Sequence, residues 1–154
     1  MSPVLGDSFP ENIRNDFAKK NLIPGNVIFC YFDAAEKEKR FVIIGINSDK
    51  SLVAVCLFNK NKPFVGYKIL EPLQIHFKSH GNPFLKYDCY LNCAHVQRIP
   101  YKRLFDELVA YPEHSLDKMS KVDFDQVCTI AANTIIISPK NVKRFGLTGY
   151  LLQK

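Results

Sequence analysis

Tryptophan is absent from this sequence of 154 residues, and its seven glycines are scattered. Without glycine clusters there is no phosphate-binding loop, no dinucleotide fingerprint and no nucleophile elbow. No apolar run reaches the length of about 18 residues that a membrane-spanning helix needs. These absences argue against the common cofactor-binding classes, and we expect no cofactor and no membrane segment.

Paired cysteine spacing is also missing, and the number of cysteines is odd. In an oxidising compartment an odd number would leave a free thiol, so reduced thiols in a cytoplasm are the simpler interpretation. The first thirty residues lack the basic and apolar regions of a signal peptide, because acidic residues interrupt them. We therefore expect a cytoplasmic protein, with free thiols at Cys30, Cys56, Cys89, Cys93 and Cys128.

Two pairs of potential metal ligands have the same spacing. His76 and His80 are separated by three residues, as are Cys89 and Cys93. A zinc site would need a strand histidine and a turn histidine to converge, and the spacing differs from the usual C-x2-C pair. We expect no metal here, only a solvent-facing histidine and two unrelated thiols.

The composition predicts one folded domain, residues 1–154, with an excess of positive charge. The apolar fraction is 47% and the formal net charge is +6. A positive net charge favours a polyanion such as RNA, or an acidic peptide, through long-range attraction. Solubility alone is the competing explanation for an excess of this size.

Six β-rich segments occupy the first two thirds of the chain. Turn residues separate them, which is typical of a barrel or a sandwich. One segment alternates as Leu-Gln-Ile-His-Phe, the pattern of a half-buried strand. The segments are 26–32, 40–46, 51–58, 73–77, 84–92 and 95–99, and a charged loop is expected at 34–39.

Helices are predicted before the first strand and after the last. The helix at 10–20, with Ser8 as a possible N-cap, has few apolar positions and is expected to be peripheral. Three more are expected at 101–110, from Ser120 to about Asn133, and at 139–145, where Gly146 ends the last helix. The fold class is therefore α+β and mainly β: a small β-barrel at 24–99 and a helical extension at 100–154.

The most unusual segment is Lys-Tyr-Asp-Cys-Tyr at 86–90. If it is a strand, Lys86, Asp88 and Tyr90 share one face, and Tyr87 and Cys89 belong to the core face. The carboxylate could help to deprotonate a ribose 2′-hydroxyl, and the cation could stabilise charge on phosphorus. The commoner explanation is a solvent-exposed pair of Lys86 and Asp88.

Other basic residues are candidates for binding phosphate. Arg40 opens the second strand, and its planar guanidinium suits a phosphate clamp, although a solvated arginine at a strand end is commoner. Lys60, Lys62 and Lys68 lie in the long loop after the third strand. They could contact a polyanion, or form only the solvated face of that loop.

The order of these segments resembles the PemK/MazF-like toxins, of which this chain would be a divergent member. The resemblance covers about residues 24–110 and includes Pro24-Gly25-Asn26, Arg40-Phe41-Val42, Lys86-Tyr87-Asp88 and Arg98-Ile99-Pro100. It implies an SH3-like barrel, a homodimer, and metal-independent cleavage of single-stranded RNA that an acidic antitoxin blocks. In the family the second strand begins Arg-Pro, and here Phe41 replaces the proline.

The resemblance also implies roles for particular residues. Arg40, Lys86 and Asp88 would be the catalytic group: Arg40 holds phosphate, Asp88 acts as base or orienter, and Lys86 stabilises the transition state. Asn59 stands where the family's third strand commonly ends in threonine or serine. The RNA-binding residues would then be Lys60, Lys62, Tyr90 and Asn59.

Three functional hypotheses follow from the sequence. The first is a toxin-like endoribonuclease of a type II toxin–antitoxin pair. The second is a catalytically inactive barrel that binds RNA or an acidic protein partner. The third is a structural or phage-type accessory protein, in which exposed aromatic residues mark a protein interface.

Overall fold

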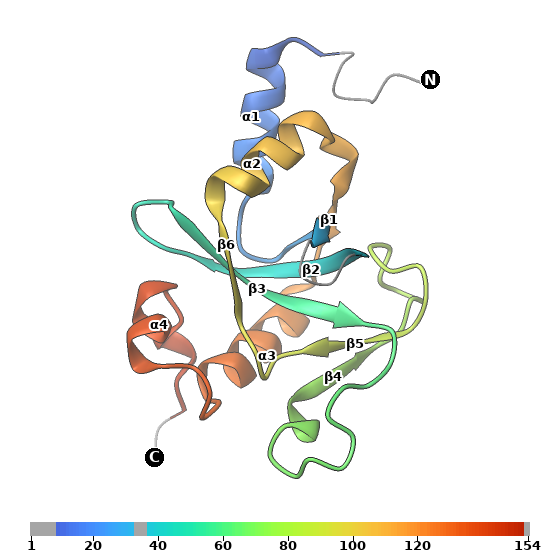
Figure 1. Ribbon diagram of the computed structural model, residues 1–154, viewed down its shortest axis with the longest axis vertical. Coiled ribbons are helices and arrows are strands. Elements are labelled where there is room, and N and C mark those ends of the chain that lie inside the picture. The colour runs from blue at the N-terminus through green and yellow to red at the C-terminus, as the bar shows by residue number, and fades with distance from the viewer. Residues whose placement is uncertain (1–8, 33–36, 153–154) are drawn as a thin grey trace.

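A computed structural model describes residues 9–32 and 37–152 of the chain. The protein is α+β: a curled antiparallel sheet forms half a barrel, and four α-helices accompany it in the described residues (Figure 1). The predicted fold class is confirmed at this level. Helices α1 and α2 lie on one side of the sheet, and α3 and α4 lie on the other.

The sheet has seven strands in the described residues. Their order across the sheet is β4-β5-β3-β2-β1-β7, and β6 also pairs with β3. All pairings are antiparallel. The strands are β1 (Asn26–Phe32), β2 (Lys37–Ile46), β3 (Leu52–Asn59), β4 (Gln74–Phe77), β5 (Cys89–Asn92), β6 (Gln97–Pro100) and β7 (Ser115–Lys118).

The central strands are buried on both faces, which explains their continuous apolar runs. Val42 and Ile44 of β2 belong to one core, shared with α3 and α4, whereas Phe41 and Ile43 face a second core under α1 and α2. Cys30 and Cys56 are buried in these strands as small apolar residues, as predicted.

The four helices agree with the sequence analysis. They are α1 (Glu11–Asn21), α2 (Tyr101–Ala110), α3 (Lys121–Ala132) and α4 (Pro139–Arg144). The first is peripheral as expected: Ala18 is the buried residue of α1, and it packs in the core shared with α2. Ser120 caps α3 as predicted, whereas Ser8 lies outside the described residues. No described helix is long and apolar enough to cross a membrane.

Three segment predictions need correction. The strand expected at 84–92 is confined to β5, because the chain turns before Cys89: the backbone N–H of Leu85 donates to the carbonyl oxygen of Asn82, and pairing with β4 begins only at Cys89. The extension at 100–154 is not wholly helical, since β7 within it pairs with β1. The loop expected at 34–39 ends earlier than predicted: residues 37–39 belong to β2, and 34–36 lie outside the described residues.

Strand β3 changes partners near its end, and this change shapes the molecule. Its first half lies between β2 and β6. Its pairing with β2 reaches Phe41 opposite Leu57, and the next two residues, Phe58 and Asn59, pair with β5. The beginning of β2 and the end of β3 therefore separate, and side chains from β2, β3 and the turn before β5 surround the space between them.

Candidate functional site

A basic cavity of about 260 Å³ lies where β2 and β3 separate. Five cationic side chains line it: Lys37, Lys39, Arg40, Lys60 and Lys86. Two amides, Asn59 and Asn61, add polar groups, and Phe58, Leu85, Tyr87 and Cys89 supply the apolar part of the wall. No acidic side chain lines the cavity in the part of the chain that the structure describes.

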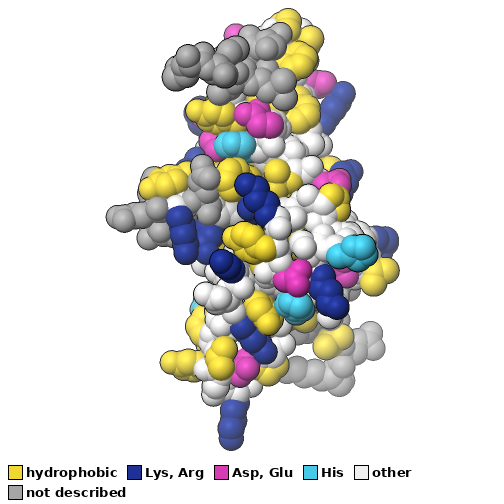
Figure 2. All heavy atoms as spheres, turned by 90° about the vertical axis from the view of Figure 1, so that its right-hand side faces the viewer, with side chains coloured by type: hydrophobic (Ala, Val, Ile, Leu, Met, Phe, Trp, Pro, Cys, Tyr) yellow, Lys and Arg dark blue, Asp and Glu magenta, His cyan; other side chains and the backbone are white. Residues whose placement is uncertain are grey.

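Figure 2 shows this side of the molecule, where β3 ends. Lys and Arg side chains gather at mid-height around hydrophobic side chains. Like charges held this close repel one another, so the arrangement stabilises an anion bound between them. The cavity thus has the charge and shape to receive a phosphate group.

The five cavity cations lack carboxylate partners among the described residues. The described ion pairs lie elsewhere, at Lys20–Asp16, Lys62–Glu71, Lys102–Asp106, Lys121–Asp125 and His114–Glu107. The difference matters because a lysine already paired with a carboxylate must give up that partner to bind phosphate. Among the described residues, no carboxylate imposes this cost on the cations of the cavity.

Arg40 packs on an aromatic ring and has no ion pair among the described residues. Its guanidinium lies over the ring of Phe29, opposite on β1, with 4.9 Å from Cζ to the ring centroid. Its Nε is buried and has no hydrogen-bond partner in the described residues. A buried donor without a partner is costly, and a bound acceptor would relieve that cost. Burial raises the pKa of the Cys89 thiol to about 11, an effect that the nearby charge of Arg40 opposes.

Lys39 is the cation of the cavity whose pKa is lowered. Its ammonium donates to Oδ1 of Asn59 at 3.1 Å, across the gap between β2 and β3. Desolvation lowers its pKa, and the charge of Lys37 adds to the effect. An amine with a lowered pKa can exchange a proton with a substrate more readily than an ordinary lysine.

Four of the seven site residues predicted from sequence meet in this cavity: Arg40, Asn59, Lys60 and Lys86. The other three lie outside its lining. Lys62 pairs with Glu71 at 3.3 Å, and Tyr90 packs on His76, with 4.9 Å between the ring centroids.

Asp88 does not share a face with Lys86, because the segment before Cys89 is not a strand. Its Oδ1 accepts hydrogen bonds from the backbone N–H of Ser79, at 2.8 Å, and from the Ser79 hydroxyl, at 3.3 Å. These bonds lower the pKa of the carboxyl group. The side chain therefore stabilises a turn, and its catalytic role stays a prediction that its position does not favour.

Sequence reasoning missed Lys37, Lys39, Asn61 and Tyr87. The two lysines were assigned to a loop, because the run of charged residues at 37–40 contains no apolar/polar alternation that would predict a strand. Tyr87 was placed on the core face, and its side chain is 48% exposed instead. The four candidate metal ligands at 76, 80, 89 and 93 form no group of three or more in the described residues.

The comparisons with known proteins add no functional assignment. No family model matches the chain, and no curated protein matches it. The function is therefore argued from the cavity itself.

Proposed function

We propose that the basic cavity binds the sugar–phosphate backbone of single-stranded RNA. The observation that carries the proposal is the set of five cations without described carboxylate partners around one cavity. Convergent lysines and an arginine suit a phosphate group, and a chain of phosphates gains from each added cation. Arg40 would hold the central phosphate, and its neighbours would attract the adjoining ones.

The resemblance to the PemK/MazF-like toxins is consistent with this site. It places the phosphate-holding arginine at Arg40 and the end of the third strand at Asn59, and both line the cavity. We accordingly propose that the half-barrel is of the SH3-like kind. The homodimer and the acidic antitoxin that the resemblance implies are further proposals, and acidic side chains would compete with RNA for the same cations.

A second candidate function is metal-independent cleavage of the bound RNA, and the lowered pKa of Lys39 favours it. The neutral amine of Lys39 would take the proton of a ribose 2′-hydroxyl. The 2′ oxygen would form a bond to the adjacent phosphorus, and the bond from phosphorus to the 5′ oxygen would break. The leaving oxygen would take a proton from water, giving a 2′,3′-cyclic phosphate and a 5′-hydroxyl. Arg40 and Lys86 would stabilise the charge that develops on phosphorus.

Both functions are tested by incubating the purified protein with a mixed single-stranded RNA in EDTA at low salt. Binding is followed by fluorescence polarisation and cleavage by gel. Arg40→Ala and Lys86→Ala should weaken binding, whereas Lys121→Ala, a lysine paired with Asp125 on α3, is the matched control and should not. Cleavage that Lys39→Gln abolishes would support the second function.

Each outcome decides between the candidates. Binding without cleavage supports the RNA-binding function alone. If RNA is neither retained nor cleaved, or if Lys121→Ala weakens binding as much as Arg40→Ala, the proposal is wrong and the net charge serves another purpose.

A further inference from the structure

The wall of the basic cavity contains one exposed aromatic ring, Tyr87, among the described residues that line it. Phe58, the other aromatic residue of the wall, is 5% exposed and belongs to the core, whereas Tyr87 is 48% exposed. About half of this residue remains in contact with water, and a flat ring beside a phosphate-binding site can cover its exposed face by stacking on a nucleobase.

The turn that carries Tyr87 is anchored on both sides. Phe84 and Leu85 are buried before it, and Cys89 is buried after it at the start of β5. Asp88 fixes the turn further through its two hydrogen bonds from Ser79. A ring presented on an anchored turn loses little conformational freedom when a ligand stacks on it.

The ring of Tyr87 is also coupled to the cations of the cavity. The ammonium of Lys60 lies over it, 5.5 Å from the ring centroid, and Lys60 lines the same cavity. A cation held at an aromatic ring is attracted to the ring's electrons and remains able to bind a phosphate. One nucleotide could therefore have its phosphate near Lys60 and its base against Tyr87.

We infer that Tyr87 is a base-stacking subsite beside the phosphate-binding cavity, which would make the site selective for unpaired nucleotides. The inference rests on the proposed RNA-binding function and adds to it a contact with the base. A base in a duplex is covered by its neighbours, so only a single strand can offer a free face to the ring.

The test compares a seven-nucleotide RNA with an abasic ribose–phosphate chain of the same length. We expect the wild-type protein to bind the RNA about 5- to 100-fold more tightly than the abasic chain. Tyr87→Ala should reduce this ratio to near one, with most of the loss of affinity on the RNA and the smaller part, through Lys60, on the abasic chain. Tyr87→Phe should retain the ratio, and Tyr67→Ala, which removes an exposed tyrosine outside the cavity lining, is the matched control.

A second readout uses the same RNA with 2-aminopurine, whose fluorescence is quenched by stacking. Quenching on binding to the wild type that disappears in Tyr87→Ala supports the subsite. If the abasic chain binds but the ratio survives Tyr87→Ala, the subsite is refuted and the RNA-binding function stands. If neither chain binds the wild-type protein, the RNA-binding function itself is refuted, and the subsite with it.

Discussion

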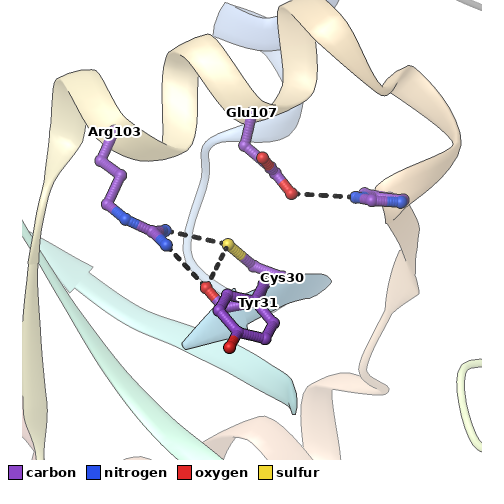
Figure 3. Close-up of polar contacts among 5 residues, drawn as sticks. Cys30, Tyr31, Arg103 and Glu107 are labelled. Atoms are coloured by element: carbon purple, nitrogen blue, oxygen red, sulfur yellow. Dashed lines mark hydrogen bonds and ion pairs between the residues drawn. The ribbon is translucent and has the colours of Figure 1, made fainter. Parts of the chain in front are cut away.

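Two arginines approach neighbouring residues of β1 from opposite faces of the sheet, and their environments differ. Arg103 of α2 donates from Nη1 to Sγ of Cys30, at 2.9 Å, and from Nη2 to the carbonyl oxygen of Tyr31, at 2.6 Å (Figure 3). Arg40 packs over the ring of Phe29, and its buried Nε has no described partner.

The charges of the groups around the two arginines also differ. Near Arg103, Glu107 accepts a hydrogen bond from His114 at 3.1 Å, so acidic and basic groups alternate at this junction (Figure 3). Around Arg40 the described groups are cationic or neutral. A polar group that holds the fold together is satisfied by the protein, whereas one that binds a ligand keeps its donors for the ligand. This difference is what we expect if Arg103 stabilises the fold and Arg40 serves the proposed RNA binding.

The largest expected effect is on RNA binding by Arg40→Met. Losing a charged hydrogen bond to phosphate should weaken affinity about 10- to 100-fold, equivalent to about 1.5–3 kcal/mol. The free energy of unfolding should change little or rise, because the variant removes a buried donor without a described partner. Titration by fluorescence polarisation and urea denaturation measure the two quantities. A large loss of stability with unchanged affinity would reverse the assignment.

The complementary variant is Arg103→Met. It removes the donors that Cys30 and Tyr31 receive from α2, so we expect the free energy of unfolding to fall by about 1–2 kcal/mol. RNA affinity, measured where the variant is fully folded, should stay within about twofold of the wild type. Urea denaturation followed by circular dichroism gives the first value. An affinity loss as large as that of Arg40→Met would break the comparison.

The sequence predicted the fold better than it predicted the site. The apolar runs in the sequence correctly located β1 to β3, because a strand that is buried on both faces is a nearly continuous run of apolar residues. Strand β7 was missed because Ser-Leu-Asp-Lys is short and polar, and it becomes a strand only through pairing with β1. Pairing between distant segments is not visible in local propensity.

The candidate site was predicted only in part, because it too depends on how distant segments pair. Arg40 and Lys86 were identified as candidates from charge and resemblance, but their meeting depends on the separation of β2 from β3. Asp88 was assigned by a period-two argument, which fails where the chain turns instead of extending. Local pattern gives residue types, and only the tertiary arrangement decides which of them share a cavity.

The salt dependence of RNA binding measures the cavity as a group of charges. Removing one cation that binds a phosphate should reduce the slope of log affinity against log salt by about 0.7 for a single strand. We expect Lys37→Gln and Lys60→Gln each to lower the slope by roughly that amount, with a modest loss of affinity at low salt. Lys102→Gln, whose lysine pairs with Asp106 on α2, should leave the slope unchanged. Equal slopes in all three variants would show that the cavity lysines do not contact the RNA.

The pH dependence should show the lowered pKa of Lys39. Because desolvation and the charge of Lys37 lower this pKa from 10.5, the affinity for RNA should fall as pH rises through the lowered value. Stability should rise in the same window, since the unfolded chain keeps its proton up to 10.5 and binds more protons than the folded one. Lys39→Gln should abolish the affinity step, and Lys37→Gln should move it to higher pH. A step that Lys39→Gln leaves in place belongs to another group.

The smallest effect is expected from Asp88→Asn. This variant tests whether Asp88 stabilises its turn or takes part in the chemistry of the cavity. The hydrogen bonds from Ser79 lower the pKa of Asp88, so their contribution to stability is present above the ordinary value of 3.8 and is lost as pH falls through the lowered one. The variant should therefore have a slightly lower melting temperature at neutral pH, a difference that disappears in acid. Its affinity for RNA should fall only slightly, because Asp88 lies outside the cavity lining and acts on the site only through the turn that carries Tyr87. Loss of RNA cleavage in this variant, with the melting temperature unchanged, would instead restore Asp88 as a catalytic group and show that the turn moves when RNA binds.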